Sequence, residues 1–367
     1  MERIIMKKKI FALMMCLTMV LALLASCSGS SEPAEEPADA EPVEVEAVEQ
    51  RTVYVTPQWV MSALAGEQSG YENIVIANVG YGPVEDSAEY NGGHIKGAIY
   101  VDNCEVEDAV GDVEQPYNLL KAEEIRDFLL ARGINKDTKV VLYGADPSSV
   151  ARQAYGYIYC GVEDVKIING GLDTWTAAGG ETETDVNTLD AATDFGCDVP
   201  AKPQYWTSMS DALDKLQNDD SFKLVSIRSE QEWLGETSGY SYMDKAGEPQ
   251  GAVWGKGPLD PYDMSGYMHE DGITTQTLDE LKAGLWSDVD FVADDSQHLA
   301  FYCGTGWRAC IPFLICYQAG LENISVYDGG WYEWMLHDEN PVQVGDPASD
   351  SVEYTTVGNL PEGKAAN

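Results

Sequence analysis

The feature that most constrains the fold is an internal repeat. When 159 is added to each number, Gly161 falls on Gly320, Gly170 and Gly171 fall on Gly329 and Gly330, and Trp175 falls on Trp334, without a gap. Apolar, strand-like runs alternate with helix-like runs in both copies. A repeat of this length built from strands and helices predicts two tandem α/β domains and argues against a solenoid.

Each copy follows a β-α-β-α-β order. Thr56 before Pro57 is typical of a helix start, because Thr caps and Pro suits the first helical position. The expected strands and helices are 74–77, 119–131 and 139–143 in the first copy, and 223–227, 278–285, 298–302, 309–319 and 324–327 in the second. Short apolar strands without alternation indicate a parallel sheet with helices on both faces. Ligands bind such sheets beyond the carboxyl ends of the strands.

Cysteine 303 stands at such an end. Residues Cys303–Arg308 read Cys-Gly-Thr-Gly-Trp-Arg and lie between the 298–302 strand and the 309–319 helix. Glycines allow a tight turn whose backbone N–H groups converge on one sulfur, and the positive end of the helix lowers a thiol pKa. The unit therefore predicts a nucleophilic thiolate. The alternative is a strand-end cysteine that only packs.

The first copy lacks this chemistry. Gly144 occupies the position equivalent to Cys303, and the loop Gly144–Ser149 contains neither a thiol nor an arginine. Residues 73–81 contain no base to match Arg228 of the second copy. We therefore expect an inactive N-terminal domain and a catalytic C-terminal domain.

The motifs around Cys303 resemble those of the rhodanese-type sulfurtransferases, most closely the periplasmic multi-domain thiosulfate sulfurtransferases. The resemblance rests on five stretches: 228–235, 237–242, 251–255, 303–309 and Ser325-Val-Tyr-Asp-Gly-Gly-Trp-Tyr-Glu-Trp334. It implies an enzyme in which Cys303 takes sulfur from an anionic donor such as thiosulfate, becomes a persulfide and passes the sulfur to a thiol or cyanide-like acceptor. The active-site loop would comprise Gly304, Thr305, Gly306, Trp307 and Arg308.

Two arginines are candidates for binding the donor. Arg308 begins a helix, which is an unfavourable end for a cation and so favours a functional role over a plain surface position. The resemblance implies that Arg228 binds the anion or supports the site; the alternative is an ion pair with Glu232. Glu232 replaces an arginine of the mercaptopyruvate enzymes, which makes that donor less favoured. Phosphatases on this scaffold place the arginine one residue later, so phosphate esters are disfavoured.

Composition excludes some partners. The formal net charge is −40, which excludes general nucleic-acid binding because that depends on Lys and Arg. An anionic donor must then be attracted by local arginines. Cys310 and Cys316 fall in the apolar 309–319 run and are expected to pack. The four histidines, His94, His269, His298 and His337, are scattered. We expect neither a metal site nor a cofactor.

The N-terminal residues resemble a lipoprotein signal. A basic start and an apolar run, 10–25, lead to Leu24-Ala-Ser-Cys27, which predicts removal of 1–26, acylation of Cys27 and extracytoplasmic attachment to a bacterial membrane. Residues 28–50 contain eight acids and no base, as in a disordered tether. The expected divisions are a signal at 1–26, a tether at 27–50, domains at 51–184 and 203–345, a linker at 185–202 and a tail at 346–367. A non-catalytic lipoprotein that binds sulfur anions or presents a persulfide to a membrane partner is the alternative function.

Overall fold

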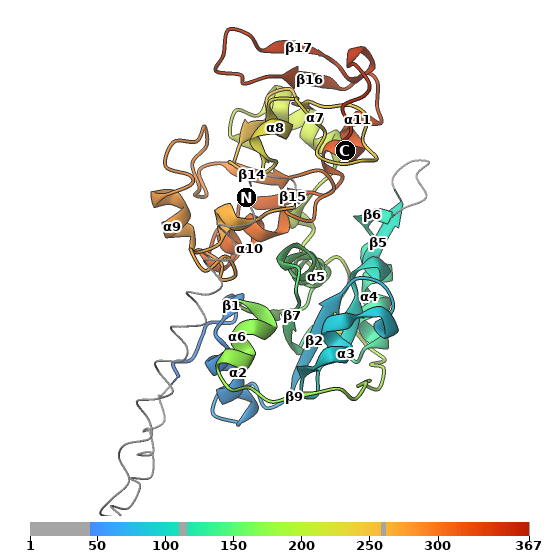
Figure 1. The fold of residues 1–367 in the computed structure, drawn as a ribbon, viewed down its shortest axis with the longest axis vertical. Coiled ribbons are helices and arrows are strands. Elements are labelled where there is room, and N and C mark those ends of the chain that lie inside the picture. Colours follow the sequence, from blue (N-terminus) through green and yellow to red (C-terminus); the bar gives the residue numbers. More distant parts are fainter. Residues whose placement is uncertain (1–44, 110–115, 258–261, 367) are drawn as a thin grey trace, which may run out of the picture. The chain divides into compact units, whose positions relative to one another are not determined.

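The computed structural model describes residues 45–109, 116–257 and 262–366 and contains two α/β domains (Figure 1). The predicted signal and Cys27 lie outside the described residues. Among those that are described, no helix combines the length and apolar character needed to cross a membrane.

The N-terminal domain is built on a parallel five-stranded sheet of order β1-β8-β7-β2-β4. Its strands are β1 (Tyr54–Val55), β2 (Ile74–Gly80), β4 (Ile99–Asp102), β7 (Lys139–Tyr143) and β8 (Asp164–Ile168). Its helices are α2 (Pro57–Leu64), α3 (Ala88–Gly92), α4 (Ala122–Ala131), α5 (Pro147–Cys160) and α6 (Gly171–Ala177). Short antiparallel pairs complete it: β3 (His94–Ile95) with β9 (Thr182–Glu183), and β5 (Glu107–Ala109) with β6 (Pro116–Leu119).

The C-terminal domain repeats this order in a parallel sheet, β10-β15-β14-β11-β13. The strands are β10 (Trp206–Thr207), β11 (Phe222–Ser226), β13 (Val253–Trp254), β14 (His298–Tyr302) and β15 (Ile324–Tyr327). The helices are α7 (Met209–Asn218), α8 (Glu230–Trp233), α9 (Leu278–Ala283), α10 (Cys310–Gln318) and α11 (Gly330–Met335). Since β7 and β14 start and end at positions 159 apart, the predicted repeat and the α/β fold are confirmed.

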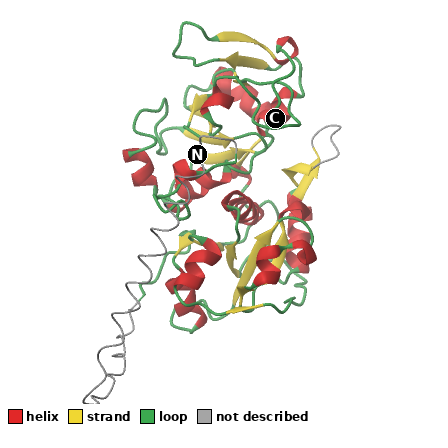
Figure 2. Cartoon of the chain, viewed as in Figure 1, coloured by secondary structure: helices red, strands yellow, loops and turns green. Residues whose placement is uncertain are grey.

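Helices cover both faces of each sheet, as expected (Figure 2). In β7, Val141 and Tyr143 pack in one cluster with residues of α2 and α6, whereas Val140 and Leu142 pack in another with residues of α4 and α5. Alternate side chains of a strand point to opposite faces, so a continuous apolar strand needs cover on both sides. The C-terminal sheet is divided in the same way between α9 and α10 on one face and α7 and α11 on the other.

Several helix starts are capped as local sequence predicts. Thr56 caps α2 as predicted, since its side chain accepts the N–H of Trp59 at 3.2 Å. Asp146 caps α5 by accepting the N–H of Ser148 at 3.0 Å. Helix α10, which follows the Cys303 loop, has no side-chain cap. The N–H groups of Cys310 and Ile311 donate instead to the carbonyls of Trp307 and Arg308, both at 3.1 Å.

Two predicted boundaries are wrong. Residues 45–50 do not belong to a free tether, because Val45 and Val48 pack against the first domain and Lys166 Nζ donates to the carbonyl of Gln50 at 2.8 Å. Residues 346–366 are not a free tail either. Strand β17 (Glu353–Thr356) pairs with β16 (Pro341–Val344), which pairs with β12 (Glu248–Pro249). The predicted linker, 185–202, contains no helix or named strand.

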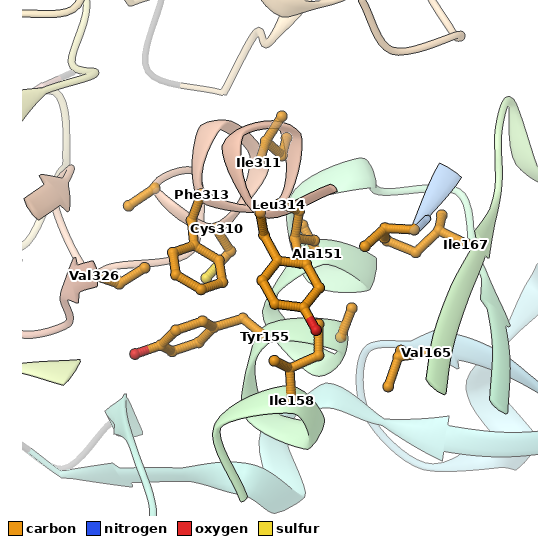
Figure 3. Close-up of a cluster of buried hydrophobic side chains, with 14 of the residues drawn as sticks. Ala151, Tyr155, Ile158, Val165, Ile167, Cys310, Ile311, Phe313, Leu314 and Val326 are labelled. Carbon is orange, nitrogen blue, oxygen red and sulfur yellow. The ribbon is translucent and has the colours of Figure 1, made fainter. Parts of the chain in front are cut away.

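The two domains share one hydrophobic cluster where α5 faces α10 (Figure 3). Tyr155 of α5 packs edge-on against Phe313 of α10, with ring centroids 5.0 Å apart. A buried interface of this kind is stabilised by removal of apolar surface from water, roughly 25 cal/mol per Å². The catalytic candidate, Cys303, belongs to the same cluster.

Hydrogen bonds at the two ends of this interface are related by the repeat. Asp328 follows β15 and accepts the backbone N–H of Leu119 at 2.8 Å. Its counterpart, Asn169, follows β8 and accepts the N–H of Thr275 at 2.8 Å. Each domain therefore binds a backbone N–H of the other through one side chain that follows β8 or β15.

Candidate active site

The Cys303 loop connects β14 to α10 at the carboxyl edge of the sheet, as the sequence predicts. The Cys303 carbonyl accepts the N–H of Trp331, and the Gly304 carbonyl accepts that of Tyr332, both at 2.9 Å. These bonds attach the start of the loop to α11. The loop is thus fixed by an element that lies on the other face of the sheet from α10.

Tyrosine 240 covers the second residue of the loop. A Cβ atom on Gly304 would lie 2.2 Å from a ring carbon of Tyr240, so only glycine fits here. Cys303 itself is fully buried, Thr305 is nearly so, and Trp307 is half-buried. A reactant can therefore reach the sulfur only if side chains over the loop move.

Arginine 308 is buried and forms a bidentate pair with Glu232. Its Nη1 and Nη2 donate to the two carboxylate oxygens at 3.1 Å each, and Nη2 also donates to the Tyr240 hydroxyl at 2.8 Å. Desolvation opposes its charge, yet the charges of Glu232, Tyr240 and Cys303 raise its pKa well above the usual value. Arg308 Nε is buried without a hydrogen-bond partner among the described residues. The guanidinium is thus held close to Cys303 with one donor unused.

Arginine 228 forms the predicted alternative, an ion pair with Glu232, at 3.1 Å. Its Nη1 donates to Gly247 O at 2.7 Å and to Glu248 at 2.8 Å, and its Nη2 donates to Ser238 O at 2.9 Å. The side chain is fully buried. Since all three nitrogens contact protein atoms, the geometry suits support of the site better than direct contact with a donor.

Glu232 joins the two arginines. Burial raises its pKa, but Arg308 and Arg228 outweigh that effect and lower it to about 2. Glu248, on the other side of Arg228, accepts a hydrogen bond from the Tyr302 hydroxyl. Burial raises the pKa of Glu248 to about 7. The buried charges of Arg308, Glu232, Arg228 and Glu248 therefore form one ion-pair network, and Arg308 connects it to the Cys303 loop. Such a network is stable only when every charge is paired, because an unpaired buried charge is costly.

Four residues that contact this site were not predicted from the sequence: Tyr240, Asp328, Glu107 and Arg152. Tyr240 and Asp328 stand within the stretches that carry the family resemblance, so position relative to the motifs was a usable signal. Glu107 and Arg152 come from the N-terminal domain. Trp307 Nε1 donates to Glu107 at 3.1 Å, and burial raises the pKa of Glu107 to about 7. Their contribution depends on contact between domains, which no local pattern reveals.

The equivalent loop of the N-terminal domain has a different character. Gly144 replaces the cysteine at the end of β7, and a cavity of about 410 Å³ opens beside it. Gly170, Gly272 and Thr275 are among the residues that line it. No lining residue is a base or a cysteine, so the cavity offers neither a nucleophile nor a cation to a sulfur anion.

Comparison with known proteins shows the family of both domains. The model of the rhodanese-like domain matches residues 84–178 and again residues 209–337. The chain belongs to the rhodanese-type sulfurtransferase family. Both copies of the repeat are thus rhodanese-like, including the copy without the cysteine.

The similar proteins include thiosulfate sulfurtransferases. The thiosulfate sulfurtransferase YnjE of Escherichia coli is 41% identical over 259 residues, which cover 70% of this chain and 57% of that protein. The rhodanese chain therefore spans little more than half of that relative. A putative thiosulfate sulfurtransferase of Haloferax volcanii is 29% identical over 301 residues, covering 81% of this chain and 98% of that protein.

Solved structures agree with the fold. The crystal structure of YnjE has a TM-score of 0.72 and 36% identity, covering 80% of this chain and 68% of that one. The anaerobic ergothioneine biosynthesis enzyme of Chlorobium limicola, solved with its natural substrate trimethyl histidine, has a TM-score of 0.73 and 31% identity, covering 84% and 74%.

The other two cysteines of this unit, Cys310 and Cys316, are free and fully buried on α10, and burial raises the pKa of both thiols. Replacing Cys316 with alanine should lower the free energy of unfolding by about 1 kcal/mol, through loss of packing alone. Cys310→Ala should cost at least as much, because its thiol also donates to the Gly306 carbonyl at 3.3 Å. Urea unfolding measures this loss, and sulfur uptake per folded molecule should stay at the parental level. Loss of uptake in the Cys316 variant at parental stability would show instead that its thiol takes part in the reaction.

Proposed function

We propose that this protein is a sulfurtransferase that moves sulfane sulfur from an anionic donor such as thiosulfate to a thiophilic acceptor through a persulfide on Cys303. The observation that carries the proposal is a strand-end cysteine in a glycine-containing loop, followed by a helix without a side-chain cap and backed by a buried arginine. Membership of the family supports the same chemistry.

In the first step the thiolate of Cys303 attacks the outer sulfur of thiosulfate. The bond between the two sulfur atoms of the donor breaks, and its electron pair leaves with sulfite. In the second step the acceptor, a thiolate or cyanide, attacks the outer sulfur of the persulfide, and the electron pair of that bond returns to Cys303. Both enzyme species are anions. Backbone N–H groups of the loop, the start of α10 and the charge of Arg308 suit their stabilisation.

A second class of acceptor is suggested by tyrosines around the loop. The Tyr240 ring centroid lies 5.4 Å from that of Tyr242 and 5.6 Å from that of Tyr262, and Tyr262 is largely exposed. Faces of aromatic rings attract cations, including quaternary ammonium groups. The similar structure with trimethyl histidine makes a cationic acceptor the second candidate.

Steady-state turnover distinguishes catalysis from sulfur binding. The full-length protein in detergent should convert thiosulfate and cyanide to sulfite and thiocyanate over many cycles, and trimethyl histidine can replace cyanide in a parallel assay. Uptake of one sulfur atom without turnover with any acceptor would contradict the enzyme and favour a lipoprotein that presents a persulfide.

We also propose that the protein is an extracytoplasmic lipoprotein anchored through Cys27, on the basis of the sequence before and after that residue. Cys27→Ala should abolish incorporation of labelled palmitate and leave the uncleaved precursor. Cys16→Ala is the matched control, because it removes a cysteine of the same N-terminal segment outside the cleavage motif. Equal labelling of the Cys27 variant and the parent would rule out this anchor.

A further inference from the structure

A cluster of three buried charges lies between the two domains, next to the Cys303 loop. Arg152 of α5 donates through Nε to Glu107 at 2.8 Å and through Nη1 to Asp328. Glu107 and Arg152 belong to the N-terminal domain, and Asp328 follows β15 of the C-terminal domain. The three side chains are at most 1% exposed.

This cluster contacts two consecutive residues of the loop. Glu107 accepts the indole N–H of Trp307 at 3.1 Å. Gly306 has a φ of +79°, and a Cβ atom placed on it would lie 2.7 Å from Asp328 Oδ1 and 3.0 Å from Arg152 Nη1. The backbone of Gly306 thus packs directly against the Arg152–Asp328 ion pair. A shift of Arg152 or Asp328 would leave this part of the loop without support.

The repeat provides an internal comparison. At the equivalent position of α10, Arg152 is matched by Ile311, and Asp328 is matched by Asn169. The interface therefore forms at its other end without this charge pair, and a cavity lies there beside Gly144. Buried ion pairs add little stability compared with well-packed apolar side chains. Stability alone does not account for a fully buried pair at the end that carries Cys303, where the repeat has Ile311 and Asn169 at the other end.

We propose that Arg152 is a positioning residue for sulfur transfer: through Asp328 and Glu107 it holds Gly306 and Trp307, and hence the loop around Cys303, in its active conformation. The N-terminal domain, which has Gly144 at the position equivalent to Cys303, then supports the catalytic site of its neighbour. This inference rests on the proposed persulfide at Cys303. Displacements of about 1 Å by a remote substitution can lower rates by about 100-fold, so small shifts of the loop are sufficient.

The test compares Arg152→Met with Lys166→Met in the full-length protein. Lys166 is a buried cation of the same domain, paired with Asp164 at 2.9 Å, and has no hydrogen bond to the loop. Arg152→Met should lower kcat for thiosulfate by about 10- to 100-fold while KM changes by less than about threefold, since the donor is not contacted. Lys166→Met should lose stability and keep the parental kcat per folded molecule.

Two further variants keep the test decisive. Arg152→Lys retains the charge without the two-pronged geometry, and should show an intermediate kcat even if Arg152→Met does not fold. Asp328→Asn should lower kcat as well, and the double variant with Arg152→Met should be no slower than the slower single one, because both act through one contact.

The two proposals fail in different ways. If the parent takes up sulfur on Cys303 and both Arg152 variants keep its kcat, the positioning role is wrong and the sulfurtransferase stands. Equal loss of kcat in Lys166→Met would likewise show a general effect of instability and overturn the role of Arg152. If the parent takes up no sulfur on Cys303, the proposed function fails and this inference fails with it.

Discussion

Replacing Cys303 with serine should abolish sulfur uptake. After incubation with thiosulfate, the parent should gain the mass of one sulfur atom, located on Cys303 by peptide mass spectrometry and removed by cyanide or dithiothreitol. The serine variant should gain none, and its turnover should fall by at least about 1,000-fold, because removal of a covalent nucleophile eliminates the intermediate. A hydroxyl is slightly smaller than a thiol, so the fold should remain.

Cys316→Ala is the matched control for this experiment. It removes a second fully buried cysteine of the same strand–loop–helix unit and should retain the added sulfur. Sulfur uptake by the serine variant at the parental level would place the acceptor thiol elsewhere, and the other cysteine variants would then identify it.

Replacing Glu232 with glutamine should cause the largest loss of stability. The carboxylate is fully buried and pairs with both Arg228 and Arg308, so the amide would leave two buried cations without a counter-charge on this side. Breaking a buried pair of this kind typically costs about 3–5 kcal/mol. Denaturant unfolding at neutral pH should show this loss. Glu236→Gln, an exposed change just after α8, should alter the free energy of unfolding by less than about 0.5 kcal/mol.

The same pair of variants should differ in their response to acid. The pKa of Glu232 is about 2 in the folded protein, compared with 4.5 for an unperturbed glutamate. Its stabilisation is therefore fully present above pH 4.5 and is lost as the pH falls through about 2. The difference corresponds to about 3 kcal/mol. The difference in free energy of unfolding between the parent and Glu232→Gln should fall by this amount in acid. A difference that does not change with pH would contradict the charged state assigned to Glu232.

Local patterns predicted the central strands and the place of the Cys303 loop at the end of β14. Strands β7 and β14 were located to the residue, because short buried apolar runs with a fixed repeat leave little freedom of register. Cys303 and its loop were found for the same reason, since all their signals lie within a few positions. Strand β17 was missed because its side chains are exposed or half-buried and show no apolar pattern.

The supporting shell of the site was harder to predict for a physical reason. An arginine four residues before a glutamate suits either a bound anion or an ion pair, and only the surrounding carbonyls and Glu248 favour the second role for Arg228. Arg152 meets partners 45 and 176 positions away. The contact with Glu107 depends on how the N-terminal domain folds, and the contact with Asp328 depends on how the two domains pack. Neither can be recognised from neighbouring positions in the sequence.

The buried pair of Arg152 and Asp328 is present at only one of the two related ends of the domain interface. This difference affects which substitutions related proteins can accept. A domain without a nucleophile would ordinarily be free to accumulate substitutions, but the proposed role of Arg152 makes part of this domain necessary to the C-terminal one. Among descendants, the loop around Gly144 should tolerate replacement, whereas changes at Arg152 should be accompanied by compensating changes at Asp328 or Glu107. The N-terminal domain would then be retained because the C-terminal domain needs its contacts, even if the N-terminal domain binds no ligand of its own.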